Sequence, residues 1–331
     1  MKKFLVTGGA GFIGSHIVER LIKNGHFVRV LDNFSSGKRE NLSFAVDRRP
    51  STVDRTVDRG PSTMDFELIE GDIRDKSICD VVCRGVEYVL HQAALRSVPK
   101  SLKNPGEYNE VNIGGTLNML EAALKNKVRG FVFASSSSIY GEATRFPERE
   151  EDLPRLISPY ALTKLAGEYY CRVFSQNYGL SCASLRYFNV FGPRQSLDDE
   201  YAVVIPKFIT CMLKDEPPPI YGTGKQSRDF TYVDNIVEAN LLATKKHNFK
   251  GEVFNIASGK DYSILELAKI LNKILNKNIK PVFLGARPAD VFRTLADLSR
   301  AKKTLGFKPK IYFTKGLQLT LEYFRQRCLK K

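Results

Sequence analysis

A tyrosine and a lysine four residues apart, Tyr160 and Lys164, are the side chains of this sequence best suited to moving protons. Residues at positions i and i+4 share one face of a helix. A lysine ammonium near a tyrosine stabilises the phenolate and lowers the pKa of the phenol from about 10 toward neutrality. The tyrosine can then act as a general base. Because a Tyr–Lys pair also occurs as an ordinary surface contact, its function depends on the elements around it.

Four consecutive serines, residues 135–138, follow the apolar run Phe131–Ala134. In an open parallel sheet, ligands bind beyond the carboxyl ends of the strands. Hydroxyl groups at that edge can hydrogen-bond a sugar oxygen and share its proton with a base, although a polar turn has the same composition. We interpret Ser136, Ser137 and Ser138 as candidate site residues.

A glycine-rich segment, residues 7–14, follows the first apolar run and opens a helical pattern. Its glycines fit two spacings, because either Gly8 or Gly9 can be the first of three. Such glycines let the backbone turn tightly and approach a pyrophosphate at a helix N-terminus. Asp32 ends the second apolar run, where a carboxylate accepts hydrogen bonds from an adenosine ribose and repels a 2′-phosphate. These segments predict binding of NAD rather than NADP, through Gly8, Gly11, Phe12, Ile13, Gly14, Asp32 and Asn33.

The elements that must position these residues alternate along the chain. Short apolar runs predict strands at 4–7, 27–31, 66–69, 88–90, 131–134 and 182–186, and helical patterns cover 14–23, 116–125 and 161–176. Strands that alternate with helices predict βαβ units and a parallel sheet. After about residue 190 the pattern loosens, with helices expected at 263–275 and near 315–328.

The predicted fold is therefore α/β, a Rossmann-like doubly wound parallel sheet with a smaller C-terminal α/β lobe. We assign residues 1–190 and about 235–260 to the NAD-binding part, and about 191–234 and 261–331 to a lobe that binds the substrate. Residues 46–54 recur as residues 57–65 with an 11-residue period, too short and polar for a solenoid. We interpret 46–65 as a tandem insertion in a surface loop, with no catalytic role.

Composition excludes several classes of protein. The chain has 331 residues and a formal net charge of +15, but its Lys and Arg residues are spread along the chain, so we expect no nucleic-acid partner. No apolar run is long enough to span a membrane, and the first one breaks at Gly8-Gly9, which predicts a cytoplasmic protein. The six cysteines form no CxxC pair, and Cys79 and Cys83 have no partners for a zinc site, so no metal is expected.

The order of these motifs resembles the extended short-chain dehydrogenase/reductase family, and within it the UDP-hexose 4-epimerases. The resemblance covers nearly the whole chain except residues 46–65. It is carried by TGGAGFIG (7–14), DNFSSGKRENL (32–42), GDIRD (71–75), HQAA (91–94), SSSSIYGE (135–142), SPYALTK (158–164), LRYFNVFGPRQ (185–195), RDFTYVDNI (228–236) and RPADV (287–291).

The resemblance implies a role for each matching residue. Tyr160 would take the proton of the sugar 4-hydroxyl while C4 passes hydride to NAD⁺, and the 4-keto sugar would rotate and be reduced on its other face. Lys164 would hold the nicotinamide ribose, and Ser136 matches the catalytic Ser/Thr. Asp72 and Ile73 would border the adenine, and Ala93 would line the cofactor cleft. The UDP portion would be held by Asn189, Arg228, Arg287 and Asp290. The helices at 116–125 and 161–176 match those that pair in family homodimers, so a homodimer is also implied.

The serines and one threonine narrow the reaction. Related 4,6-dehydratases carry Asp-Glu in place of Ser137-Ser138, and related UDP-glucuronate decarboxylases carry Glu in place of Ser138, so both reactions are disfavoured. Ala289 stands where the related proteins commonly have glycine, so the loop around Arg287 departs from the family pattern at this position. Thr294 matches a position where a bulky tyrosine excludes N-acetyl groups, so a small threonine predicts that UDP-GlcNAc and UDP-GalNAc are accepted along with UDP-glucose and UDP-galactose.

Three readings of the function remain open. The first is a 4-epimerase, which recycles its NAD. The second is another sugar-nucleotide enzyme of the family, a UDP-glucuronate 4-epimerase or a reductase that consumes reduced cofactor. The third is a nucleotide-sensing regulator without catalysis, which the presence of both Tyr160 and Lys164 disfavours.

Overall fold

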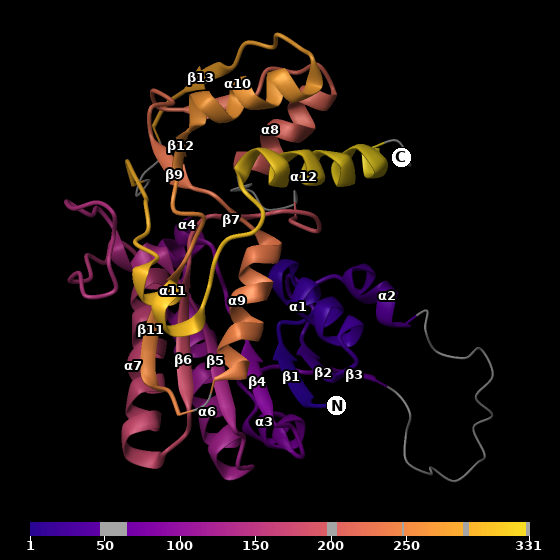
Figure 1. The fold of residues 1–331 in the computed structure, drawn as a ribbon, viewed down its shortest axis with the longest axis vertical. Coiled ribbons are helices and arrows are strands. Elements are labelled where there is room, and N and C mark those ends of the chain that lie inside the picture. The colour runs from indigo at the N-terminus through magenta and orange to yellow at the C-terminus, as the bar shows by residue number, and fades with distance from the viewer. Residues whose placement is uncertain (47–64, 197–203, 247, 287–290, 329–331) are drawn as a thin grey trace.

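Seven parallel strands form the central sheet of the protein (Figure 1). The computed structural model describes residues 1–46, 65–196, 204–246, 248–286 and 291–328. The strand order is β11-β6-β5-β4-β1-β2-β3, so the order reverses at β1, which pairs with both β2 and β4. A reversal of this kind opens a crevice beyond the strand ends. The strands are β1 (Lys3–Thr7), β2 (Phe27–Asp32), β3 (Phe66–Glu70), β4 (Tyr88–His91), β5 (Gly130–Ser136), β6 (Cys182–Tyr187) and β11 (Lys250–Ile256).

Helices cover both faces of the sheet, as the α/β prediction required. Successive strand residues point to opposite faces. In β1, accordingly, Leu5 packs into one buried cluster while Phe4 and Val6 pack into the other. One face is covered by α1 (Phe12–Lys23), α9 (Val233–Lys245) and α11 (Ser299–Leu305), and the other by α3 (Lys76–Cys83), α6 (Gly115–Lys125) and α7 (Pro159–Tyr178). The predicted doubly wound fold is confirmed.

Short elements after the strands shape the crevice. The chain after β2 forms a 3₁₀ turn and the one-turn helix α2 (Ser43–Val46). After β4 it forms α4 (Val98–Lys103), α5 (Pro105–Tyr108) and a π-helical turn, Asn109–Gly114. After β5 it forms a 3₁₀ turn, Ser137–Tyr140, capped by Ser136.

A third buried cluster lies in the C-terminal part of the chain. Figure 1 shows α8, α10 and α12 gathered at one end of the molecule, beyond the sheet. Phe191, Phe208, Leu267 and Phe313 are among the residues buried there. The elements are β7 (Val190–Phe191), α8 (Val204–Leu213), β8 (Pro219–Tyr221), β9 (Ser227–Asp229), β10 (Thr231–Tyr232), β12 (Asp261–Ser263), α10 (Ile264–Leu275), β13 (Val282–Leu284) and α12 (Phe313–Cys328). Their strands form three two-stranded sheets.

The contacts of α11 bear on the proposed division of the chain. Its buried residues Ala301 and Leu305 belong to the cluster on the α1–α9 face of the sheet, together with Phe307. Their position in the sequence alone predicts that these residues belong to the substrate lobe. Their packing favours moving them to the nucleotide-binding part, and the rest of the division stays a prediction.

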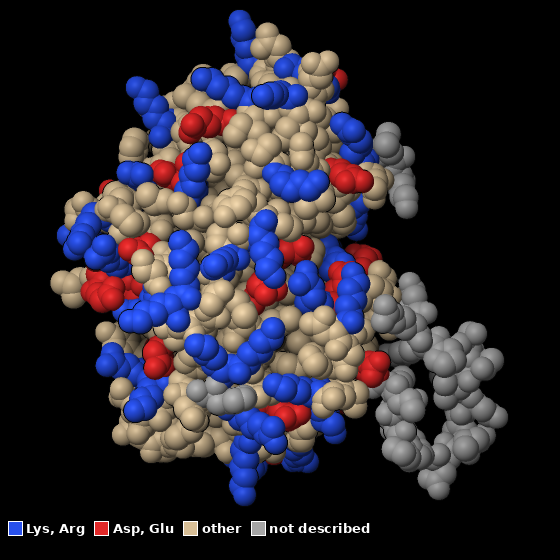
Figure 2. All heavy atoms as spheres, viewed as in Figure 1, with Lys and Arg blue, Asp and Glu red and all other residues tan. Residues whose placement is uncertain are grey.

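Figure 2 shows Lys and Arg spread over the whole of one face, with fewer Asp and Glu among them. No helix among the described residues is long and apolar enough to cross a membrane. Most of the predicted tandem insertion, residues 47–64, lies outside the described part of the chain.

Candidate active site

One cavity of about 1160 Å³ opens at the crevice of the sheet and extends toward the C-terminal cluster. Segments far apart in the sequence meet there, because the carboxyl ends of β1, β2, β4, β5 and β6 share one edge. The predicted site residues that line it are Gly8, Gly11, Phe12, Ile13, Gly14, Asp32, Asn33, Asp72, Ile73, Ala93, Ser136, Ser137, Ser138, Tyr160, Lys164, Asn189, Arg228 and Thr294. Arg287 and Asp290, the two other predicted residues, lie outside the described part of the chain.

The glycine loop leaves room for a ligand at the start of α1. Gly8 has a φ of +66°, and a Cβ on Gly14 would lie 2.1 Å from the carbonyl oxygen of Gly8. Gly11 caps the helix without any side chain between its N-terminus and the cavity. Gly9 instead packs closely against Val30. Of the two spacings, Gly8-Gly11-Gly14 is therefore the one that faces the cavity, and the helix N-terminus that begins there suits a pyrophosphate.

Asp32 and Asp72 line the cavity beside this loop. The Asp32 carboxylate accepts hydrogen bonds from the backbone N–H groups of Ala10 at 2.9 Å and Phe34 at 2.8 Å. Burial raises the pKa of Asp32. Hydrogen bonds from Arg74 lower the pKa of Asp72 to about 2, and Asn33 donates to the same carboxylate at 2.9 Å. Both segments thus present fixed polar groups to the cavity.

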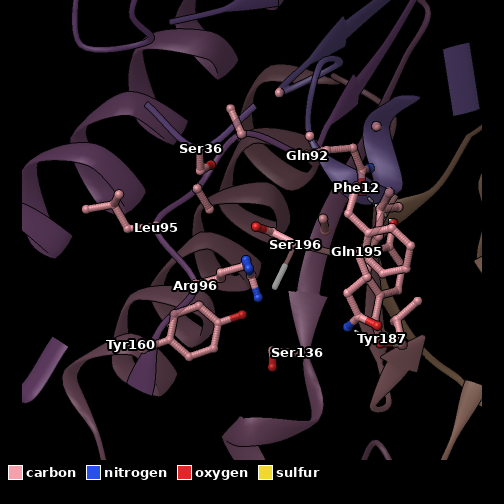
Figure 3. A pocket seen from close by; sticks show the side chains of 18 of the residues that line it. Phe12, Ser36, Gln92, Leu95, Arg96, Ser136, Tyr160, Tyr187, Gln195 and Ser196 are labelled. Carbon is pink, nitrogen blue, oxygen red and sulfur yellow. Dashed lines mark hydrogen bonds between the residues drawn. The ribbon is translucent and has the colours of Figure 1, made fainter. Parts of the chain in front are cut away.

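Tyr160 and Lys164 project into the cavity from the first two turns of α7. The Ser158 side chain caps the helix by accepting from the Ala161 N–H at 3.2 Å, and Pro159 occupies its first turn. The side chains of Tyr160 and Ser136 lie near one another in Figure 3, and a side-chain hydrogen bond with Ser136 is one of the influences on the pKa of Tyr160. Lys164 is buried and donates to the Ala134 carbonyl at 2.8 Å.

Burial moves the pKa values of this pair in opposite directions. It lowers the pKa of Lys164 to about 7 and raises that of Tyr160. The Ser136 hydrogen bond and the charge of Arg96 oppose this rise in the pKa of Tyr160, which stays above its ordinary value. The structure thus brings together a phenol, a serine hydroxyl, a lysine and an arginine, a set of groups that general acid–base chemistry can use.

A buried ion pair holds α7 against the sheet. Glu168, one turn after Lys164, binds Arg186 with N–O distances of 2.9 and 2.8 Å. The Ser135 hydroxyl donates to the same carboxylate. Because both partners are buried, removing either would leave an uncompensated charge in the core. The pair ties α7 to the ends of β5 and β6.

The far end of the cavity is formed by the C-terminal segments. The Thr294 hydroxyl accepts from the Asn189 amide at 2.8 Å and from the Asp229 N–H at 3.2 Å, and Thr294 is 5% exposed. Arg228 donates to the Ser227 carbonyl at 2.7 Å. Among the described residues, the buried hydroxyl of Ser138 has no hydrogen-bond partner, so this cavity-lining group can bind a ligand hydroxyl.

Several cavity residues escaped the sequence analysis. Arg96 lies two residues after the HQAA motif, and a cation so near a recognised motif was the signal that could have identified it. Other lining residues come from loops or, for Tyr187, from the last residue of β6: Gln92, Leu95, Tyr187, Gln195 and Ser196. Asn112, a buried residue outside the cavity lining, gave no signal, because only the π-helical turn brings it within 3.0 Å of Thr163 on α7.

Known proteins resemble this chain in sequence and in fold. Residues 4–257 match the NAD dependent epimerase/dehydratase family. The chain belongs to this family, the extended short-chain dehydrogenases/reductases, and the resemblance of the motifs is confirmed.

Individual relatives align over nearly their whole length. The chain is 38% identical to a putative UDP-glucose 4-epimerase of Methanocaldococcus jannaschii, over 97% of this chain and 98% of that protein. A solved UDP-N-acetylglucosamine 4-epimerase of Methanobrevibacter ruminantium, in complex with UDP-N-acetylmuramic acid, is 39% identical with a TM-score of 0.88, covering 98% and 99% of the two chains. A UDP-glucuronic acid 4-epimerase of Bacillus cereus, solved with UDP-glucuronic acid and NAD, is 34% identical with a TM-score of 0.87 and the same coverage.

NAD is the cofactor of this chain, as predicted. The residues present fit it, because the glycine loop provides a side-chain-free cradle at a helix N-terminus and Asp32 stands at the end of β2.

Proposed function

We propose that this protein catalyses the 4-epimerisation of a UDP-hexose. The observation that carries the proposal is the meeting of Tyr160, Ser136 and Lys164 at one end of a cavity whose other end reaches Asn189 and Arg228. A cavity of about 1160 Å³ exceeds the 300–1,000 Å³ typical of small-molecule sites, so it has room for a dinucleotide and a nucleotide sugar side by side.

The residues of this chain would hold and move the protons of the reaction. When bound, NAD supplies the acceptor and donor of the hydrogen at C4 of the sugar. Tyr160 takes the proton of the sugar 4-hydroxyl and returns it after the hydride has been restored on the other face. Ser136 hydrogen-bonds the same oxygen. Lys164 keeps positive charge near the phenolate and holds the nicotinamide ribose, while Arg228 binds the diphosphate, which a guanidinium recognises bidentately.

The identity of the sugar is the finer part of the proposal. We infer that UDP-GlcNAc and UDP-GalNAc are accepted along with UDP-glucose and UDP-galactose, because Thr294 is small and lines the cavity. The named relatives act on different sugars, so kinship alone does not choose among them. Ser137 and Ser138 line the cavity as hydroxyls, which supports epimerisation over elimination or decarboxylation.

A product assay with three substrates tests the proposal. The purified protein is incubated separately with UDP-glucose, UDP-GlcNAc and UDP-glucuronate, and the products are identified by NMR. We expect the 4-epimers of the first two and no net formation of NADH. Tyr160→Phe is the control, with loss of about 10²- to 10⁴-fold in rate and retention of NAD. Consumption of added reduced cofactor would instead indicate a reductase, and product from UDP-glucuronate alone a glucuronate 4-epimerase.

We also propose that the protein forms a homodimer through α7. Leu162, Tyr169 and Val173 are 53%, 56% and 44% exposed, and their spacing places them on one face of the helix. An exposed apolar stripe on a helix is typical of a protein–protein contact.

A further inference from the structure

Arg96 is a cation at the reacting centre that the epimerase mechanism outlined above does not use. It lines the cavity from the loop between β4 and α4. Figure 3 shows its guanidinium and the hydroxyl of Tyr160 pointing toward one another, with Ser136 nearby. The charge of Arg96 is also one of the two influences that lower the pKa of Tyr160, the other being the hydrogen bond to Ser136.

The backbone on both sides of Arg96 is held in place by buried side chains. Asn112 accepts from the Leu95 N–H at 2.8 Å and donates to the Leu95 carbonyl at 3.0 Å. The Tyr108 hydroxyl accepts from the Ser97 N–H at 3.1 Å and donates to the Ser97 carbonyl at 2.8 Å. Four hydrogen bonds to the two flanking residues fix the point from which Arg96 reaches into the cavity.

The same network connects this loop to the helix that carries the base. Asn112 donates to the Thr163 hydroxyl at 3.0 Å, and Thr163 in turn donates to the Tyr160 carbonyl at 2.8 Å. Asn112 is 2% exposed, so these bonds are shielded from water. One buried side chain, Asn112, therefore links the loop that carries Arg96 to the helical turn that carries Tyr160.

We propose that Arg96 is a positioning residue for the proton transfer, and that its permanent charge stabilises the Tyr160 phenolate in addition to Lys164. This inference rests on the proposed function, because it assigns a second cation to the same base.

The other charged groups near Tyr160 explain why a second cation matters. Burial lowers the pKa of Lys164 to about 7, with Glu168 opposing the shift, so Lys164 loses its charge at a lower pH than an ordinary lysine. His91 of β4 contributes no charge, because burial lowers its pKa to about 3. Ser136 offers a neutral hydroxyl. An arginine stays protonated at any pH at which the enzyme works.

The test is a titration of Tyr160 in the NAD-containing protein. The ultraviolet absorbance of phenolate is followed against pH, and the titration of Tyr160→Phe is subtracted to isolate this tyrosine from the others. Arg96→Gln should raise the pKa of Tyr160, and the acid limb of the kcat/KM profile should move to higher pH with it. At pH values below the pKa of Tyr160, kcat/KM of the variant should be about 3- to 10-fold lower than that of the wild type. At alkaline pH the two values should become equal. Arg96→Lys should restore most of the loss, and Lys103→Gln, on α4 outside the cavity, should have no effect.

Three results would overturn the proposal. An unchanged Tyr160 titration with loss of bound NAD would make Arg96 a ligand of the cofactor diphosphate. A loss confined to UDP-glucuronate would make it a reader of a substrate carboxylate. An equal fractional loss at every pH would indicate a merely structural role. Because the titration needs no turnover, it decides the role of Arg96 even if the protein epimerises none of the UDP-sugars.

Discussion

At the scale of single residues, the proposed choice of sugar depends most on Thr294. Its hydroxyl is held between Asn189 and Asp229, which fixes its methyl and hydroxyl at the wall of the cavity. A larger side chain at this point would occupy the space that an N-acetyl group needs.

Thr294→Tyr should therefore lower kcat/KM for UDP-GlcNAc by about 100-fold while leaving UDP-glucose within about threefold. Steady-state kinetics with both substrates measure the difference. Thr294→Val is the matched control, because it removes the hydrogen bonds from Asn189 and Asp229 without adding bulk. Equal losses for the two sugars in Thr294→Tyr would refute the role of Thr294 in selecting the sugar.

The sequence predicted those site residues that belong to contiguous motifs, and the reason is geometric. Tyr160 and Lys164 share a helix face, and Gly8, Gly11 and Gly14 share one loop, so spacing alone relates them. Asn112 and Arg96 could not be found in this way. Their roles depend on a π-helical turn and a loop whose conformations arise from tertiary hydrogen bonds.

At the scale of elements, one loop holds the segment that carries Thr294. Glu148 and Leu295 bind each other through two hydrogen bonds, from the Glu148 N–H to the Leu295 carbonyl at 2.7 Å and from the Leu295 N–H to the Glu148 carboxyl at 3.0 Å. Burial, with the nearby carboxyl of Asp229 contributing, raises the pKa of Glu148 to about 8.

This raised pKa makes the stability of the fold depend on pH. Between the ordinary glutamate value of 4.5 and about 8, the native state keeps the proton that the unfolded state has released, so stability falls as pH rises through this window. Glu148→Gln removes the titration and should be more stable than the wild type above pH 8, by at least ~2 kcal/mol, with little difference at pH 4.5. Urea denaturation at several pH values measures this, with the exposed Glu142→Gln as control. A constant difference at all pH values would mean that Glu148 does not titrate in this range.

The strands of the nucleotide-binding part were predictable because they are buried on both faces and appear as continuous apolar runs. All six predicted strands are present in the sheet. The seventh strand, β11, and the helix α11 were not predicted, since their places depend on packing with distant elements. The short strands after residue 190 lack any period that the sequence could reveal, because each has only two or three residues.

At the scale of the whole molecule, the exposed stripe on α7 predicts a dimer. Leu162→Glu combined with Tyr169→Glu would place two charges in the contact, so the mass in solution should fall from about twice 37.3 kDa to 37.3 kDa. Light scattering after gel filtration measures it. Tyr178→Glu is the control, because Tyr178 is 57% exposed on the same helix but on another face. A wild type that is already monomeric would contradict the proposed dimer.

The central claim is that the hydrogen at C4 of the sugar leaves and returns within one enzyme-bound cofactor, while Tyr160 carries only the hydroxyl proton. A UDP-sugar labelled with deuterium at C4 tests it most directly. We expect that the 4-epimer formed in ordinary water retains the deuterium at C4 and that NADH does not accumulate. Replacement of the deuterium by hydrogen from the solvent, or an epimer formed at another carbon, would contradict it.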